Sequence, residues 1–275
     1  MKNTFLITTL LATTALASMA QAACTNNQTC GDNCCWELTQ NGGTSENPTY
    51  ELTISGTGPM TDFNSNGDVP WYNQRDSITS VEVQKGITSI GSKSFSKATN
   101  LTSVTIPDSV TSIGVGAFYE ATGLTSITSP NSLTSIGDKA FAGAGLTSIT
   151  IPDSVTSIGS SAFNAPSLTS ITIPDTAALG ANLFSKRDLS NITIHCAGVL
   201  EQCKANMAAA GYADGTYNME QAPYSKKQAD GSRAYYDANG KLTGFTGKRI
   251  YTVEDARTAV EAAGTDTVNI RIRYK

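Results

Sequence analysis

Six cysteines are the residues of this chain whose chemistry is most specific, because thiolates can bind a metal ion or be oxidised to disulfides. A zinc site made of four thiolates usually shows two closely spaced cysteine pairs, and only Cys30 and Cys34 have that spacing, without a matching second pair. An even number of cysteines on an exported chain favours disulfides instead. We therefore expect disulfides, no metal site and no cofactor. The candidate residues are Cys24, Cys30, Cys34, Cys35, Cys196 and Cys203.

The spacing of the cysteines decides only part of the pairing. Cys196 and Cys203 flank the start of an expected helix, so we predict a local bridge between them. The four N-terminal cysteines allow three pairings. The pairing that joins the adjacent residues Cys34 and Cys35 is the least favourable, because disulfide geometry is restrictive. The other two pairings remain open.

Residues that could support catalysis or bind calcium are few. His195 is the only histidine, so a histidine-rich metal site has no second ligand, and no motif around His195 suggests a Ser–His pair. We expect His195 to be a strand-end residue. Asp108, Asp153 and Asp175 recur after a proline and could resemble calcium ligands, but aspartate at that position is typical of a turn. We predict no catalytic residue and no enzymatic activity.

A tandem repeat separates the N-terminal cysteines from the C-terminal pair. Its copies begin at Ile78, Leu101, Leu124, Leu146 and Leu168, with a partial copy at Leu189, so the period is 21–23 residues. A fixed period of this length indicates a solenoid. We predict a β-rich solenoid over residues 78–195, built from about five to six copies.

The physics of one copy explains the period. In the copy that begins at Leu101, Val104 and Ile106 alternate with polar residues, which predicts a short strand with one buried face. Pro107-Asp108 then turns the chain. Burial of one large apolar side chain contributes roughly 1.5–3 kcal/mol, whereas ordering the backbone costs about 1–2 kcal/mol per residue. One copy alone is too small to fold, and stacked copies that share their apolar faces are stable.

The outward strand positions form two columns of mostly small polar residues. Successive members of a column lie about 4.8 Å apart, which is the distance between neighbouring strands. One column is Ser80, Ser103, Ser126, Ser148, Ser170 and Asn191, and the other is Glu82, Thr105, Thr128, Thr150, Thr172 and Thr193. This face could contact a protein or a glycan, or it could simply keep the strands soluble. Ice binding is disfavoured because only one column is threonine. The candidate binding face is Ser103, Thr105, Ser126, Thr128, Ser148, Thr150, Ser170 and Thr172.

The repeat pattern LxxVxIPxxVxxIGxxAF resembles the BspA-like leucine-rich repeats of bacterial and some protist surface proteins. The resemblance covers roughly residues 30–196, because Cys30–Cys34, Tyr50–Met60 and Pro70–Tyr72 are similar to the cap that precedes such arrays. The family often has a cysteine where this chain has Ala98, Ala121 and Ala144, a change that a packed core accommodates. The resemblance implies a capped leucine-rich repeat array that binds host or neighbouring-cell macromolecules without catalysis.

The N-terminus predicts export. Residues 1–22 have the features of a signal peptide: Lys2, an apolar stretch from Phe5 to Leu16, and Ala20-Gln21-Ala22 as cleavage site. A lipoprotein cut before Cys24 is disfavoured by Gln21. Removal of residues 1–22 takes away one lysine, which changes the formal charge from −4 to −5. This mild acidity argues against nucleic acid as a partner. We expect a secreted, cell-surface or periplasmic protein with no membrane span in the mature chain.

The segments that flank the array complete the predicted organisation. We expect a cysteine-containing cap over 23–77, with a turn at Asn41–Gly43 and with Trp71 and Tyr72 covering the end of the stack. A closing helix is predicted within 196–212, and a linker with a hairpin through Asn239-Gly240 within 213–246. Residues 247–275 predict a small β-α-β tail, with a capping box at Thr252–Asp255.

Two functions are therefore compatible with the sequence. The first is an exported, non-enzymatic binding protein that engages host or neighbouring-cell protein or glycan, at the cell surface or in the extracellular matrix. The second is an envelope-associated scaffold in which the solenoid is a spacer and the β-α-β tail does the attachment. Ligand identity and oligomeric state are not encoded in any motif that we recognise.

Overall fold

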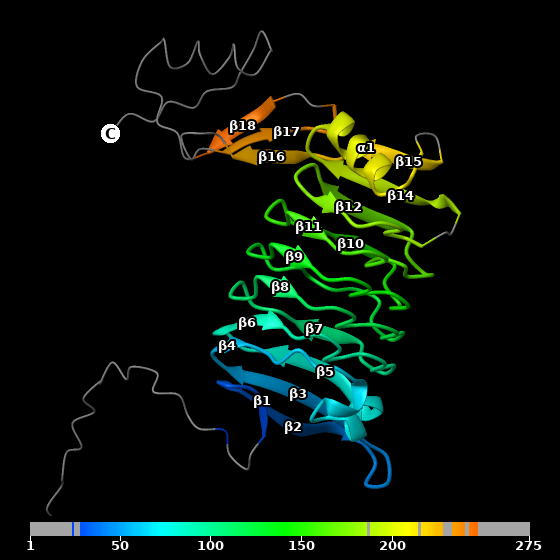
Figure 1. The fold of residues 1–275 in the computed structure, drawn as a ribbon. Helices are drawn as coiled ribbons and strands as arrows, with labels where there is room; N and C mark the ends of the chain where they lie inside the picture. The colour runs from blue at the N-terminus through cyan, green and yellow to red at the C-terminus, as the bar shows by residue number, and fades with distance from the viewer. Residues whose placement is uncertain are drawn as a thin grey trace, which may run out of the picture.

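The protein is a stack of parallel coils closed at both ends, as the computed structural model in Figure 1 shows. The structure describes Cys24 and residues 28–185, 188–213, 216–227, 233–239 and 242–246. The signal peptide predicted over 1–22 and the β-α-β tail predicted over 247–275 lie outside these residues. The β-solenoid predicted from the repeat is confirmed.

Each coil has three sides. The first side, which we call the strand side, carries the longer strands β5 (Ile78–Val83), β7 (Ser103–Thr105), β10 (Ser148–Thr150), β12 (Ser170–Pro174), β14 (Leu189–Ala197) and β15 (Tyr217–Gln221). The second side carries the short strands β4 (Gly58–Pro59), β6 (Ile87–Ile90), β8 (Ser112–Ile113), β9 (Ser135–Ile136), β11 (Ser157–Ile158) and β13 (Ala178–Leu179). The third side consists of turns that carry a phenylalanine in each copy, preceded by alanine in the middle copies, by Ser94 in the first and by Leu183 in the fifth.

A column of stacked aromatic rings fills the interior beneath the third side. Phe95, Phe118, Phe141 and Phe163 are fully buried, and successive ring centroids lie 5.3, 5.3 and 5.5 Å apart. Trp71 continues the column at the N-terminal end, with its ring centroid 5.8 Å from that of Phe95. Each phenylalanine therefore packs against the coil before and the coil after it, which is why a single copy lacks a complete core.

The glycine that follows each Ser-Ile pair allows neighbouring coils to approach closely. A Cβ atom added to Gly114 would lie 2.5 Å from the backbone nitrogen of Ser92, and one added to Gly137 would lie 2.7 Å from that of Val115. Such distances are too short for any side chain. The repeated glycine is therefore required by the stacking of backbone on backbone at this corner.

The N-terminal cap adds an antiparallel hairpin to the strand side. β2 (Cys34–Gly43) pairs with β3 (Pro48–Gly56), β3 runs parallel to β5, and the short β1 (Thr29–Gly31) pairs with the start of β2. The turn predicted at Asn41–Gly43 is wrong, because these residues extend β2 and the chain reverses over residues 44–47. The Asn41 side chain donates a hydrogen bond to the Thr79 hydroxyl at 3.0 Å, which favours strand over turn at that position.

Two short 3-10 helices, η2 (Asn66–Asp68) and η3 (Tyr72–Ser77), lie near the end of the cap, and Trp71 stands between them. Trp71 is 1% exposed, and its indole nitrogen donates a hydrogen bond to the Ser94 carbonyl at 2.9 Å. Trp71 therefore covers the end of the stack, as predicted. Tyr72 does not: it is exposed, and the Arg75 guanidinium lies 4.2 Å from its ring centroid.

All six cysteines form disulfides. Cys196 pairs with Cys203, which confirms the prediction of a local bridge. In the cap, Cys24 pairs with Cys35 and Cys30 pairs with Cys34, so the adjacent cysteines are not joined to each other.

The last copy has a different register from the one that the sequence predicts. The structure pairs Ser170 with Thr193 and Thr172 with His195, whereas the sequence alignment assigned these places to Asn191 and Thr193. Side chains in a strand alternate with a period of two, so a shift of two residues leaves the same residues facing inward. The apolar pattern alone therefore cannot distinguish the two registers.

The C-terminal end of the solenoid is more ordered than the sequence suggests. The predicted closing helix is α1 (Leu200–Ala209), which buries Cys203 and Met207. The prediction of a linker after it is wrong in part, because Tyr217–Gln221 forms β15, a further rung parallel to β14. The Gln221 side chain donates hydrogen bonds to the carbonyls of Cys196 and Gly198, which holds the strand in place although its sequence is polar. Beyond it, β16 (Tyr224–Lys227), β17 (Arg233–Tyr236) and β18 (Leu242–Thr246) form an antiparallel sheet, and β17 and β18 are the predicted hairpin.

Candidate binding surfaces

The predicted binding face lies on the strand side and points to solvent. Ser103, Thr105, Ser148 and Thr150 are exposed, as are Ser126 and Thr128, whereas Ser170 and Thr172 are half-buried. Within each pair of strands the columns are in register: β10 and β12 place Ser148 beside Ser170 and Thr150 beside Thr172. The structure therefore brings the eight residues together on one face that spans four successive coils.

The hydroxyl groups of this face are not used by the fold. Across the described residues, none of the eight side chains makes a hydrogen bond, although Thr102, Thr147 and Thr169, which precede three of the serines, do. Thr102 donates to the Thr79 carbonyl at 3.0 Å, and Thr169 donates to the Thr147 carbonyl at 3.1 Å. Threonine therefore has two roles in the second, fourth and fifth copies. One threonine ties neighbouring coils together, and the next outward one leaves a donor and an acceptor free.

Charged groups occur only at the two ends of the face. Glu82 lies beside Thr105 at the N-terminal end, since β5 and β7 pair these residues. At the C-terminal end His195 lies beside Thr172, and its Nδ1 is 3.7 Å from a carboxylate oxygen of Glu220 on β15. His195 is therefore a strand residue with one acidic neighbour. The middle of the face offers hydrogen bonding without charge.

A second surface, which sequence reasoning missed, is an open groove of about 500 Å³ along the second side. Ser89, Ser112, Ser135 and Ser157 line it in register. Asp62 and Asp138 also line the groove, and their carboxylates each accept a hydrogen bond from a backbone N–H of the next coil, both at 2.7 Å. The serine that precedes each Ile-Gly pair was the sequence signal for this surface.

The aspartates that follow the repeat proline act in the turns. The Asp108 carboxylate accepts a hydrogen bond from the Asn131 backbone at 3.0 Å, and that of Asp175 accepts one from the Val199 backbone at 2.8 Å. Both contacts connect a coil to a later one. The observed contacts fit the predicted turn role of these two residues.

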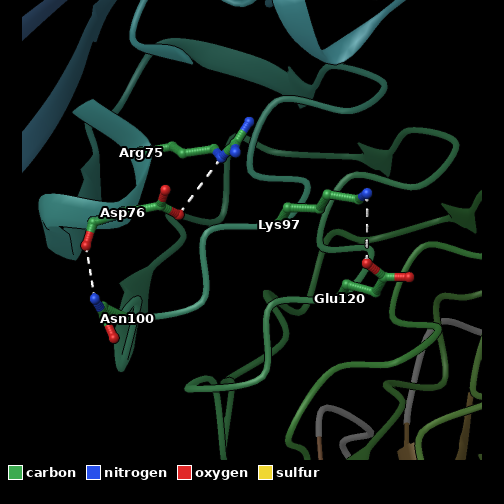
Figure 2. Close-up of polar contacts among 5 residues, drawn as sticks. All are labelled: Arg75, Asp76, Lys97, Asn100 and Glu120. Carbon is green, nitrogen blue, oxygen red and sulfur yellow. Dashed lines mark hydrogen bonds and ion pairs between the residues drawn. The ribbon is translucent and has the colours of Figure 1, made fainter. Parts of the chain in front are cut away.

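Polar contacts on the third side also connect neighbouring coils. Figure 2 shows the Asn100 amide donating to the Asp76 carbonyl at 2.7 Å and Lys97 lying 3.7 Å from Glu120. In the same view Arg75 lies 3.5 Å from the carboxylate of its neighbour Asp76. These groups pair locally or with the adjacent coil, so we do not assign them a ligand.

The described residues also bear on two other kinds of site, metal sites and membrane spans. Among them, no group of three or more histidine, cysteine, aspartate or glutamate side chains is placed to hold a metal ion. Nor does any helix in this part of the chain have the length and apolar character needed to cross a membrane.

Comparison with known proteins identifies the repeat. Residues 70–193 match the family model described as a BspA type leucine rich repeat region, in six copies. No curated protein matches the chain. Among solved structures, a leucine-rich repeat protein from Eubacterium ventriosum is 29% identical over 72% of this chain and 45% of that one, with a TM-score of 0.49. This chain thus spans less than half the length of that protein.

Two further solved structures are more distant. A leucine-rich repeat protein from T. pallidum is 20% identical over 66% of this chain and 96% of that one, with a TM-score of 0.39. One from Bacteroides ovatus is 18% identical over 68% of this chain and 67% of that one, with a TM-score of 0.37.

Proposed function

Because residues 70–193 form a BspA-type leucine-rich repeat region, we propose that the protein is an exported binding module without catalytic activity. Its strand face contacts a protein or a glycan at the cell surface or in the extracellular matrix. The observation that carries this proposal is the set of eight hydroxyls that face solvent and make no hydrogen bond within the described structure. The solenoid sets the spacing of these groups within each block of coils, and the caps protect its ends.

The chemistry of the face favours an uncharged partner surface. A hydroxyl can donate and accept, so paired Ser and Thr columns match amide and sugar groups equally well. Charged groups are restricted to Glu82 at one end and the His195–Glu220 pair at the other, which disfavours a strongly charged ligand in between. The nearly flat array also suits recognition by many weak contacts rather than by one deep pocket.

Export is supported by the cysteines as well as by residues 1–22. Three disulfides are consistent with an oxidising compartment, where such bonds persist. We propose that the mature chain is secreted, held at the cell surface or periplasmic. Catalysis is not proposed, because the described cysteines are oxidised and no hydrogen bond joins a hydroxyl to His195 among the described residues.

The experiment that tests this function is a pull-down from extracellular matrix and whole-cell lysates with the mature protein. The double variant Thr128→Lys/Thr150→Lys places two charges in the middle of the face. The control Thr122→Lys/Ser167→Lys places the same charges on exposed turns that precede the third and fifth copies. If Thr128→Lys/Thr150→Lys loses the captured partner and the control retains it, the strand face is supported as the binding surface.

Two other outcomes would contradict that assignment. Loss of the partner with Ser112→Lys/Ser135→Lys, and not with Thr128→Lys/Thr150→Lys, would place binding in the groove of the second side. Equal capture by every variant would favour the scaffold alternative, in which the solenoid is a spacer. Deletion of residues 247–275 would then be the change that abolishes attachment.

A further inference from the structure

The sheet on the strand side is divided in two. One sheet ends with β7 and the next begins with β10, and the intervening residues 124–132 belong to no strand. Among backbone groups of this stretch, the Thr125 carbonyl accepts a hydrogen bond from the Thr147 N–H at 3.1 Å. The described structure shows no backbone hydrogen bond between residues 126–129 and β7. The third coil, residues 124–145, is therefore loosely joined to its neighbours on this side.

A single residue explains the interruption. Neighbouring copies place Ile106, Ile151 and Ile173 before the repeat proline, and Ile151 and Ile173 are at most 1% exposed. The third copy has Ser129 there, and Ser129 is only half-buried. A serine lacks the apolar surface that draws the end of the strand into the core, and a buried hydroxyl needs a partner. The segment therefore lacks the anchor that holds the other strands in register.

The core is less well covered beside this gap. Val104 and Ile127 are only partly buried, whereas their equivalents in better paired coils, Val81, Ile149 and Ile171, are 2%, 4% and 0% exposed. Ile106 is also only partly buried, whereas its equivalents Ile151 and Ile173 are 1% and 0% exposed. The difference follows the position of the break rather than residue type.

The other two sides of the third coil are intact. On the second side Ser135 pairs with Ser112 before it and with Ser157 after it. On the third side the Phe141 ring stacks on Phe118 at 5.3 Å and on Phe163 at 5.5 Å. The coil is thus held along its second and third sides and open along the strand side.

We propose that the third coil is a hinge of the solenoid. The strand side opens and closes at residues 124–132, and the second side and the phenylalanine column form the axis about which the two blocks turn. The candidate binding face is divided by this hinge, since Ser126 and Thr128 lie on it. The hinge is a property of the third coil itself and does not depend on what the face binds.

The motion can be measured by distance distributions between pairs of spin labels, attached through unnatural amino acids so that the native disulfides remain. Labels at Glu82 and Asn191 span the hinge on the strand side, and labels at Thr88 and Ala178 span it on the second side; all four positions are exposed. We expect a broad distribution for the first pair and a narrow one for the second. Ser129→Ile should narrow the first distribution and leave the second unchanged.

Hydrogen exchange on the full chain provides the second measurement. Amides of residues 125–129 should exchange at least about tenfold faster than those of β12, and Ser129→Ile should slow them by at least about tenfold. Thr128→Ile is the matched control, because it adds the same side chain at the outward position and should not slow exchange. Distance distributions of equal width for the strand-side pair and the second-side pair would overturn the proposal. So would amides of 125–129 that are as protected as those of β12, or equal responses to the two isoleucines.

Discussion

The rings of Phe118 and Phe141 stack with their centroids 5.3 Å apart and their planes within 2° of parallel. These residues are 23 positions apart in the sequence, so the contact exists only because two coils are in register. The two side chains are fully buried, and each also packs against the phenylalanine on its other side. The contact is the most direct sign that each coil completes the core of its neighbours.

Truncation of one ring should therefore destabilise more than one coil. We expect Phe141→Ala to lower the free energy of unfolding by about 3–5 kcal/mol, because it removes a large buried side chain and leaves a cavity between two rings. Denaturant unfolding of the purified chain measures the change. Val115→Ala is the control, since Val115 is 47% exposed and its truncation should change stability by less than about 0.5 kcal/mol. Similar losses for both variants would contradict the role of the column.

The corner glycines should not tolerate a methyl group. We predict that Gly114→Ala lowers the free energy of unfolding by about 1–3 kcal/mol, because its Cβ atom would lie 2.5 Å from the Ser92 nitrogen and would push two coils apart. Gly67→Ala is the matched change in the cap, where the nearest atom, the Ser65 hydroxyl oxygen, is 3.8 Å away. The melting temperature should fall for the first variant and stay within error for the second. A normal melting temperature for Gly114→Ala would refute close stacking at that corner.

The C-terminal disulfide should stabilise the closing helix. Replacing Cys196 and Cys203 together by alanine opens a short loop and should lower the free energy of unfolding by about 2–4 kcal/mol. Exchange of the amides of α1 and β15 should rise more than that of β6 and β8, because the bond lies at the far end of the stack. An unchanged exchange pattern after reduction of this bond would argue against its role as a clamp.

Alkaline pH should weaken the same end of the molecule. Burial raises the pKa of the Tyr212 hydroxyl, which accepts a hydrogen bond from the Phe184 backbone at 2.8 Å and donates one to the Ser185 carbonyl at 3.1 Å. Because the folded pKa lies above the unfolded value, the neutral hydroxyl is favoured in the fold. The stability that it contributes is complete below pH of about 10 and is lost as the pH rises through the folded pKa.

Tyr212→Phe provides the test of that titration. It removes both hydrogen bonds, so its stability near neutral pH should be lower than that of the parent chain. Its stability should also fall less steeply between neutral and strongly alkaline pH, as followed by urea unfolding at each pH. Parallel pH profiles for the two proteins would show that another group is responsible.

Much of the fold could be predicted because it is periodic. Inward positions such as those of Ile113 and Phe118 recur along the array, as Ile136 and Phe141 do one copy later, and the structure buries these residues. What could not be predicted lies where the period ends. A two-residue shift of Thr193 and His195 preserves the inward pattern, and β15 has no repeat motif because Gln221 holds it through side-chain hydrogen bonds.

The candidate site shows the same division. The outward columns follow from strand alternation, so the sequence located Thr128 and Thr150 on one face. Which hydroxyls are free could not be predicted, because Thr102 and Thr105 are the same residue type in the same copy. Only the structure shows that Thr102 bonds to the preceding coil and that Thr105 does not. The break in the strand-side sheet at Ser129 could not be predicted either, because it becomes visible only when the pairing of the neighbouring strands is known.

The measurement that tests the central claim most directly is an equilibrium binding curve for the partner captured in the pull-down. It compares the parent chain, Thr128→Lys/Thr150→Lys and the control Thr122→Lys/Ser167→Lys, with melting temperatures recorded for all three. We predict at least about tenfold weaker binding for the first variant, because two lysines would lie in the middle of an uncharged contact surface. The control should bind as the parent does. Equal affinity of all three proteins, with folding intact, would contradict the assignment of the strand face as the binding surface.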